Sequence, residues 1–366
     1  MINVSNWDER KLRYEEYWNC TNKTPLLHIT APKFGAVRDE ILEEEDSETF
    51  WFDPKHIVKG LRKDFNNTYF GGDAFPSVSP SLGPDLLSAL IGLEIKYNNS
   101  SAWVVHKDCP LSEFKDFSIT KNNFYYEKIK EMLNYFAEDA KDDAYIVGMV
   151  DLNAGLDGVA SLIGPDKLCF EMIDTPEEVL RVNNEILNLY TKLFSELYKI
   201  TNKYQKGTAN WLPIYSESEW YYITCDFMVM ISDEHFEEFI RWEIEKRVDF
   251  HGRALFHLDG ENAIRHLDKI LEIPNLTGVQ VQATPFVHSG KFWIEHIKKI
   301  QEHGKCVCID AIDEEDIKAL IENCKPEGLF IRAWFDNEDK AKRVIDMVSE
   351  YYSKNCNNKC IKGEEK

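Results

Sequence analysis

The sequence predicts an α/β protein built as a single (β/α)8 barrel of the TIM type, with an N-terminal helical extension and loop insertions over the barrel mouth. From about residue 205 onward, short apolar runs typical of buried strands alternate with segments of helical periodicity. Right-handed crossovers between such strands give a parallel sheet, and a long closed series of them gives a barrel. The chain has 366 residues, of which 43% are hydrophobic, and α/β barrels of this length form one domain.

Seven apolar runs are the expected strands, at 25–30, 144–152, 221–227, 253–260, 277–283, 306–311 and 328–335. Helical periodicity predicts an amphipathic helix within the first 24 residues and further helices over 177–204, 233–250, 261–271, 290–303, 313–323 and 337–353. The region 31–140 is rich in turn residues, and we interpret it as barrel elements interrupted by insertions. We expect the barrel to span residues 1–355. Apolar periodicity stops after that, so 356–366 is expected to be a disordered tail.

The composition excludes some classes of partner. A formal net charge of −21 disfavours nucleic acids and anionic membrane surfaces, because both require a basic face. Nine scattered cysteines indicate reduced, intracellular thiols rather than a disulfide framework. The charged N-terminus lacks the apolar core of a signal peptide, and no apolar run approaches the roughly 18 residues of a membrane span. We therefore expect a cytoplasmic protein that acts on a small molecule.

The most informative pair of residues stands at the end of the apolar run 253–260. Residues two apart on a strand point to the same face, so His257 and Asp259 are expected to face the barrel interior together. They lie at the C-terminal end of the strand, where barrel enzymes place their active sites. Imidazole and carboxylate both bind zinc, which makes this pair a candidate metal site. The alternative is an acid that hydrogen-bonds a histidine.

Other candidates stand at strand ends and in turns. The expected catalytic residues are Asp73 in a glycine-rich turn, Asp226 just past the strand that begins at residue 221, and His288 in the loop after the strand 277–283. Each has a structural alternative, as a capping, packing or solvated loop residue. The expected substrate-binding residues are Gln280, Trp220, Tyr222 and Arg332. The cysteines at 225, 306 and 308 are expected to be core thiols.

Three segments together resemble the uroporphyrinogen decarboxylase superfamily. The match spans roughly residues 60 to 335, and the order and spacing of the segments carry the resemblance. The matching segments are YFGGDAFP (69–76) with LGP (82–84) and LIG (90–92), CDF (225–227) with Ile231, Ser232 and Phe236, and HLDG (257–260) with HLD (266–268), Ile273-Pro274 and Val279-Gln280.

The resemblance implies a (β/α)8 barrel with one of two chemistries, decarboxylation of porphyrinogen acetates or methyl transfer involving a corrinoid. Zinc methyltransferases of the superfamily carry His-x-Cys where this chain has His257 and Asp259, and they have a further cysteine near the last strand. We expect methyl transfer between a small methylated compound and a corrinoid held on a separate protein, in one-carbon metabolism. In this hypothesis His257 and Asp259 hold Zn2+ as a Lewis acid, and Asp226 or His288 moves protons.

Two alternatives remain open at this point. The first is a decarboxylase of a porphyrin-like or other carboxylate substrate. Classical porphyrinogen decarboxylases resemble one another in an arginine-rich N-terminal segment, where this chain offers only Lys33 and Arg38, so the classical activity is not expected. The second is a catalytically idle barrel that binds a small ligand.

Overall fold

A computed structural model of the chain describes residues 4–36, 47–98, 101–142, 144–282 and 290–362. The chain forms two compact units. Unit 1 comprises Met1–Asn3, Asp39–Arg62 and Ser77–Leu276, and unit 2 comprises Val4–Arg38, Lys63–Pro76 and Thr277–Lys366. Both units mix helices with strands, and each is described by itself below.

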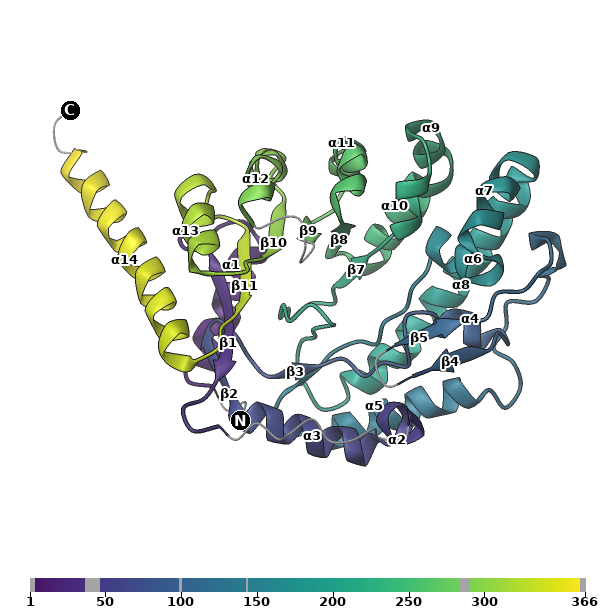
Figure 1. Cartoon of the computed structure of the whole chain (residues 1–366), viewed down its shortest axis with the longest axis horizontal. Helices are drawn as coiled ribbons and strands as arrows, with labels where there is room; N and C mark the ends of the chain where they lie inside the picture. The colour runs from purple at the N-terminus through teal and green to yellow at the C-terminus, as the bar shows by residue number, and fades with distance from the viewer. Residues whose placement is uncertain (1–3, 37–46, 99–100, 143, 283–289, 363–366) are drawn as a thin grey trace. The chain divides into compact units, whose positions relative to one another are not determined.

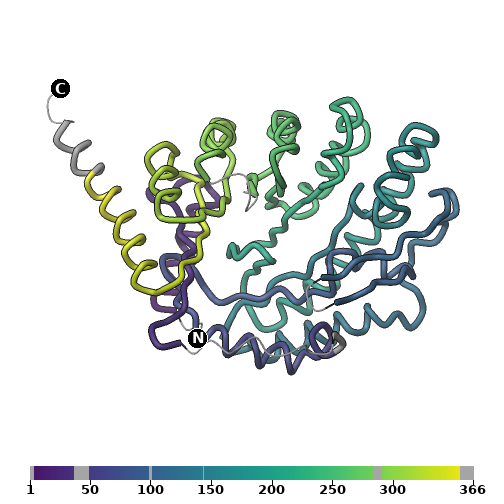
Figure 2. The backbone as a smooth tube through the Cα atoms, viewed as in Figure 1, coloured from purple at the N-terminus to yellow at the C-terminus, as the bar shows by residue number. Residues whose placement is uncertain are grey.

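The sheet of unit 2 has the strand order β2-β1-β11-β10-β9. Its central strands are parallel, and β2 joins β1 antiparallel at the edge. The strands are β1 (Leu26–Pro32), β2 (Thr68–Gly72), β9 (Gly278–Gln282), β10 (Cys306–Asp310) and β11 (Leu329–Trp334). Figure 2 shows that β1, from the start of the chain, lies beside β11, from its end. Most residues of β1, β9, β10 and β11 are buried, as expected when helices cover both faces of a parallel sheet.

The helices of unit 2 pack against these strands. α1 and α14 contact β1, and α12 contacts β10. Their bounds are α1 (Trp7–Trp18), η5 (Gly290–Trp293), α12 (Ile294–Glu302), α13 (Glu314–Asn323) and α14 (Glu338–Lys362). The side chain of Asp313 caps α13 by accepting the Asp316 N–H at 2.8 Å, which satisfies one of the helix's unpaired donors.

Unit 1 has three short pairs of strands. β7 and β8 are parallel, β3 and β6 are parallel, and β4 and β5 are antiparallel. The bounds are β3 (Ser77–Val78), β4 (Ile95–Tyr97), β5 (Ala102–Val104), β6 (Ile146–Val147), β7 (Tyr221–Ile223) and β8 (Ala254–Asp259). The register of β7 and β8 pairs Tyr221 with Ala254 and Ile223 with Phe256. This pair of strands positions the candidate site.

Helices account for most of unit 1, and Figure 1 labels its α-helices. The longest helix, α8, begins with Pro176 followed by Glu177 and Glu178, a start that suits the fixed φ of proline and the positive end of the helix dipole. The bounds are α2 (Ser47–Phe52), α4 (Leu86–Leu90), η1 (Leu111–Glu113), α5 (Phe124–Ala140), α6 (Leu156–Ile163), α7 (Pro165–Asp174), α8 (Pro176–Thr201), η2 (Asp226–Met230), α9 (Asp233–His235), η3 (Phe236–Ile240), α10 (Arg241–His251), η4 (Glu261–His266) and α11 (Leu267–Leu271). One further helix, α3 (Pro54–Asn67), contributes residues to both units.

The structure confirms the mixed α/β class and the parallel strands that the sequence predicts. The expected strands at 144–152 and 221–227 are shorter than predicted, because β6 ends at Val147 and β7 at Ile223. α14 is longer than the predicted helix 337–353 and continues to Lys362, into the segment for which we expected a tail. No helix among the described residues has both the length and the apolar character needed to cross a membrane.

Candidate metal centre

The ends of β7 and β8 bring Asp226, His257 and Asp259 together. Potential ligand atoms of these three side chains all lie within 4.8 Å of one another. His257 and Asp259 lie two apart on β8, so they project from the same side of the strand. The parallel register that pairs Ile223 with Phe256, continued by three residues, brings Asp226 level with Asp259. The predicted metal pair therefore has a third candidate ligand at the start of η2, just past the end of the neighbouring strand.

A buried carboxylate fixes the backbone at Asp226. Asp157, in the first turn of α6, accepts the backbone N–H groups of Asp226 and Phe227, each at 2.9 Å. These two N–H groups belong to the first turn of η2, where intrahelical partners are missing. Burial raises the pKa of Asp157, and the two N–H groups act in the opposite direction. Asp157 therefore holds the position of Asp226 without being a candidate ligand itself.

A buried ion pair on α10 contacts the backbone just past the end of β7. Glu243 and Arg247 on α10 are 0% and 3% exposed, and their side chains meet at 2.9 Å. Arg247 also donates to the carbonyl oxygen of Thr224 at 3.1 Å. A Cβ at Gly155, where φ is +71°, would lie 2.0 Å from a Glu243 oxygen, so only glycine fits there.

Asp226 is crowded by other carboxylates. Partial burial is the main cause that raises the pKa of Asp226 to about 7, followed by the charges of Asp157, Asp259 and Asp151. Among the described residues, no lysine or arginine forms an ion pair with Asp226, Asp259 or Asp151. Neighbouring carboxylates without cations repel one another, and a bound cation relieves that repulsion.

A second carboxyl group with a raised pKa lies beside the candidate centre. Tyr222 on β7 donates a hydrogen bond to Asp151, and burial raises the pKa of Asp151 to about 6 against the lowering effect of that bond. The Trp211 ring contacts both Tyr222 and His257 edge-on, with centroid distances of 5.1 and 5.2 Å. Asp151 and Tyr222 thus form a hydrogen-bonded pair, and the charge of Asp151 contributes to the raised pKa of Asp226.

The three ligands suit a divalent cation. Three protein ligands with an open position are typical of catalytic zinc sites, with ligand distances near 2.1 Å. The ligand atoms lie within 4.8 Å of one another, so closing them around an ion requires them to approach further. The donor set of one imidazole and two carboxylates is harder than a thiolate set and accepts Mn2+ or Fe2+ as well as Zn2+.

Cys225 precedes Asp226 but does not contribute a thiolate. The side chain is fully buried, and burial is the main cause that raises its pKa well above the ordinary thiol value. A thiol in such surroundings is inert. It fits the expected role of a core residue.

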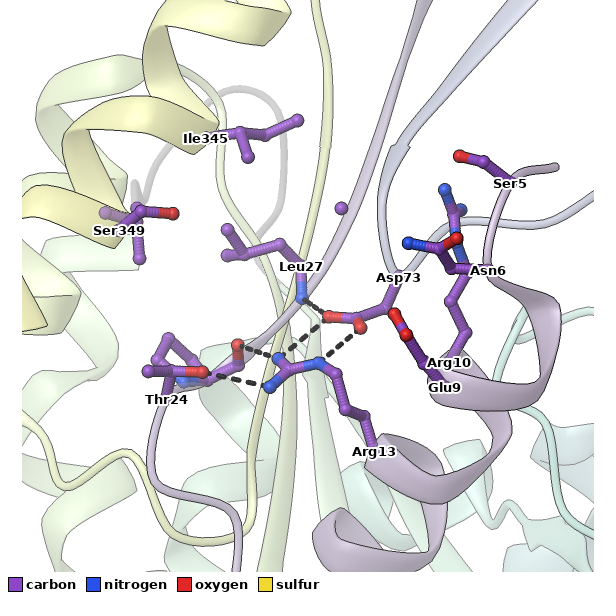
Figure 3. A pocket seen from close by; sticks show the side chains of 13 residues that line it. Ser5, Asn6, Glu9, Arg10, Arg13, Thr24, Leu27, Asp73, Ile345 and Ser349 are labelled. Carbon is purple, nitrogen blue, oxygen red and sulfur yellow. Dashed lines mark hydrogen bonds and ion pairs between the residues drawn. The ribbon is translucent and has the colours of Figure 1, made fainter.

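Asp73, a predicted catalytic residue, lies in unit 2 and is held by an arginine. Figure 3 shows the Arg13 guanidinium facing the Asp73 carboxylate, with distances of 2.5 and 3.0 Å. The backbone N–H of Leu27 donates to the same carboxylate at 2.9 Å. These residues line a cavity of about 300 Å³ that α14 also borders. The sequence also allowed Asp73 to cap a following helix. The observed partners of its carboxylate are instead Arg13 and the Leu27 N–H.

The remaining predicted residues are distributed as follows. Arg332 forms two hydrogen bonds with Asp310, of 2.7 and 2.6 Å, and Gln280 is fully buried and donates to Gln282 at 2.9 Å. Both residues belong to unit 2. Trp220 is fully buried in unit 1, so its ring is part of the core. His288 lies outside the described residues. Of the predicted substrate-binding residues, Tyr222 is the one that the contacts with Asp151 and Trp211 connect to the candidate centre.

Sequence reasoning assigned no role to Asp151 and Asp157, and it did not place Asp226 among the metal ligands. One signal was available for two of them. Asp151, Asp226 and Asp259 each follow an apolar run directly, at the carboxyl end of an expected strand. Carboxyl ends of parallel strands meet at one edge of a sheet, so three such acids predict one acidic cluster. Asp157 gives no such signal, because it looks like an ordinary acid in a first helical turn.

Comparison with known proteins finds structural similarity but no sequence match. No family model matches the sequence, and no curated protein matches it. A methyltransferase from Methanosarcina mazei has a similar structure, with a TM-score of 0.56 and 14% sequence identity. The likeness covers 94% of this chain and 99% of the methyltransferase. At this identity the similarity concerns the fold, which the two chains share over nearly their whole lengths.

Proposed function

We propose that this chain is a metal-dependent methyltransferase of the uroporphyrinogen decarboxylase superfamily, folded as the (β/α)8 barrel that the sequence predicts. The observation that carries the proposal is the cluster of Asp226, His257 and Asp259, three potential ligands within 4.8 Å. Two further observations support it. The cluster lacks a neutralising lysine or arginine among the described residues, and the fold resembles that of a methyltransferase over nearly the whole chain.

The cation in this proposal is Zn2+, which would supply Lewis acidity at the open position. His257 binds in its neutral form and the two aspartates in their ionised forms. Asp157 and the pair formed by Glu243 and Arg247 hold the end of β7, so that Asp226 keeps its place when the neighbouring charges change. Supporting bonds of this kind orient metal ligands and tune their affinity.

Proton transfer belongs to Asp151 in this proposal, because Asp226 is occupied as a ligand. A carboxyl group whose pKa is about 6 exchanges protons readily near neutral pH. The bond from Tyr222 orients the carboxyl group. The methyl group moves between a small methylated compound and a corrinoid carried by a separate protein, and the aromatic ring of Trp211 lies beside His257 as an apolar wall for that substrate.

Uroporphyrinogen is a poor candidate substrate for this centre. It is a polyanion that needs several cationic partners, whereas Asp151, Asp226 and Asp259 surround the candidate site with negative charge. A decarboxylase of a smaller substrate is the second candidate, and a carboxyl group such as Asp151 fits the protonation of a carbanion. Release of CO2 from a smaller carboxylate substrate above that of a heat-killed control would favour this second candidate, whereas we expect no such release from uroporphyrinogen.

Elemental analysis of the full chain, purified without chelator, tests the metal. We expect about one Zn2+ per chain and a loss of affinity of roughly 100-fold or more in His257→Ala, Asp226→Asn and Asp259→Asn, since each removes one ligand. Asp249→Asn, which changes an exposed carboxylate on α10, is the matched control and should bind as the wild type does. The site is contradicted if the wild type is purified free of metal and if His257→Ala leaves the affinity for added Zn2+ unchanged.

A separate experiment tests the reaction. The metal-loaded chain is incubated with a panel of methylated corrinoid proteins, and methyl exchange is followed by the change in corrinoid absorbance. We expect exchange with at least one of them, and loss of the exchange in His257→Ala. If the chain binds zinc but neither binds nor exchanges methyl groups with any corrinoid protein, the methyltransferase proposal fails while the metal site stands.

A further inference from the structure

Two cysteines that the candidate centre does not use lie in contact within unit 2. Cys20 follows the C-terminal end of α1, and Cys306 is the first residue of β10. Their sulfur atoms are 3.5 Å apart, although the residues are 286 positions apart in sequence. Cys306 is buried and Cys20 is partly exposed. A reagent in solution therefore reaches one thiol of the pair first.

The backbone around Cys20 fixes the position of its thiol. Cys20 has a φ of +51°, a left-handed conformation that residues other than glycine seldom adopt. Its N–H donates to the Tyr17 carbonyl oxygen at 3.0 Å, and the Cys306 thiol lies 3.1 Å from the same oxygen. A Cβ at Gly328 would lie 2.6 Å from the Cys20 sulfur. Glycine at position 328 thus leaves the space that the Cys20 thiol occupies.

Cys20 differs in its chemistry from the buried cysteines. A hydrogen bond from Cys306 is the main cause that lowers the pKa of Cys20, while burial and the charge of Glu327 oppose it. Burial raises the pKa of Cys324 to about 11, and it also raises the pKa of Cys225. The thiolate is the reactive form of cysteine, so the partly exposed Cys20 is the nucleophile and Cys306 is placed to resolve the product.

We propose that Cys20 and Cys306 form a reversible disulfide when the protein meets a peroxide or a small disulfide. With hydrogen peroxide, the Cys20 thiolate takes one oxygen atom and becomes a sulfenic acid, releasing water after protonation. Cys306 then attacks that sulfur, a second water leaves, and the S–S bond forms. Two thiols and one peroxide give one disulfide and two waters. A dithiol reductant reverses the reaction by thiol–disulfide exchange.

Disulfide formation requires only a local movement. The S–S bond is about 2.05 Å long, so the two sulfur atoms must approach by roughly 1.5 Å, which rotation about the Cα–Cβ bonds can supply. The new bond would tie the end of α1 to the start of β10. Because it closes a very long loop, it restricts the unfolded chain strongly and should stabilise the oxidised protein. This inference is independent of the proposed metal centre and methyl transfer.

The test uses the full chain treated with hydrogen peroxide, or with oxidised glutathione, followed by alkylation and non-reducing peptide mapping. We expect a peptide pair joined through Cys20 and Cys306 as the main product, and a melting temperature raised by roughly 5 °C that returns on reduction. Cys109→Ser and Cys169→Ser are the controls, because these two cysteines share the intermediate exposure of Cys20. Both variants should give the same crosslink as the wild type.

Two variants separate the roles of the thiols. Cys20→Ser, at the more exposed position, should abolish the crosslink and leave Cys306 resistant to the oxidant. Cys306→Ala should leave Cys20 as a stable mixed disulfide with glutathione, because the thiol that would displace the glutathione is removed. The proposal is overturned if wild-type Cys20 accumulates as the mixed disulfide or as a higher oxide without crosslinking. It is also overturned if the main crosslink joins other cysteines.

Discussion

Two groups of acidic residues, one in each unit, differ in their charged partners. In unit 2, Asp73 and Asp310 each face an arginine that binds both carboxylate oxygens. In unit 1, Asp151, Asp226 and Asp259 lie near one another with no such partner among the described residues. Bidentate pairs of arginine and carboxylate satisfy both charges. Carboxylates gathered without a cation cost stability, unless a ligand or a proton neutralises them.

This difference separates Asp73 from Asp226 more clearly than their positions along the chain do. Asp73 and Asp226 both occur at the edge of a strand, and both were predicted to be catalytic. Asp73 is held at the end of β2 by Arg13 and by the Leu27 N–H, so its charge is used to join α1 to the sheet. Asp157 accepts the backbone N–H of Asp226, and among the described residues no lysine or arginine forms an ion pair with the Asp226 carboxylate.

The largest effect on stability is expected at the ion pair of unit 2. Asp73→Asn should lower the free energy of unfolding by about 2 kcal/mol, because it leaves the partly buried Arg13 without a charged partner. Asp226→Asn should change it by no more than about 0.5 kcal/mol, or raise it, since it removes one of several mutually repelling charges. Urea unfolding of the metal-free variants measures both values.

A double-mutant cycle with Arg13→Gln checks the origin of the first effect. If the ion pair is responsible, the two single changes should not add, because each removes the same interaction. Equal losses in Asp73→Asn and Asp226→Asn would remove the contrast between the two units. In that case Asp226 would be a structural residue, and the metal proposal would lose its third ligand.

A smaller effect with a defined pH dependence is expected at Asp151. Its folded pKa is about 6, compared with about 3.9 in an unfolded chain. The protonated carboxyl group is therefore favoured by folding, so its contribution to stability is complete below pH 4 and is lost as the pH rises through 6. Asp151→Asn avoids this loss. As the pH rises from 4 to 8, the free energy of unfolding of Asp151→Asn should increase relative to that of the wild type by about 1–2 kcal/mol, after allowance for partial exposure.

Urea unfolding at pH 4.5, 6 and 8 measures this gain. Tyr222→Phe is the informative control, because it removes the hydrogen bond that lowers the pKa of Asp151. In the Tyr222→Phe variant, which keeps Asp151, the loss of stability should therefore extend to a higher pH than it does in the wild type. A difference between Asp151→Asn and wild type that is the same at all three pH values would mean that the Asp151 carboxyl group is not protonated in the folded state near pH 6.

Much of the fold followed from the sequence, because burial leaves a strong pattern. The runs at 253–260, 306–311 and 328–335 are apolar on both faces, and they form β8, β10 and β11. The run 144–152 forms only the two-residue β6, since the backbone after Val147 bonds to other segments, such as the Gln205 side chain and Tyr221. Such tertiary partners override local propensity and are not visible in a single sequence.

The candidate centre was only partly predictable for a similar reason. The spacing of His257 and Asp259 within one strand indicates a shared face, so that pair could be named from the sequence. Joining them to Asp226 requires the register of β7 and β8, which depends on the whole sheet. The arginine partners of Asp73 and Asp310 are 60 and 22 positions away. No local pattern distinguishes these paired acids from the unpaired ones.

The smallest expected effect concerns Arg332, which was predicted to bind substrate. Its two bonds to Asp310 suggest a structural use, and lysine retains the charge but cannot form both bonds. Arg332→Lys should therefore lower the free energy of unfolding by about 0.5–1 kcal/mol, since both side chains are about a quarter exposed. Arg62→Lys is the matched control. It alters a more exposed ion pair, in which Nε of Arg62 donates to both carboxylate oxygens of Asp139, and should cost less. If Arg332 instead binds an anionic substrate, Arg332→Lys should leave the unfolding free energy unchanged and weaken binding of that substrate, which would make Arg332 a binding residue although it pairs with Asp310.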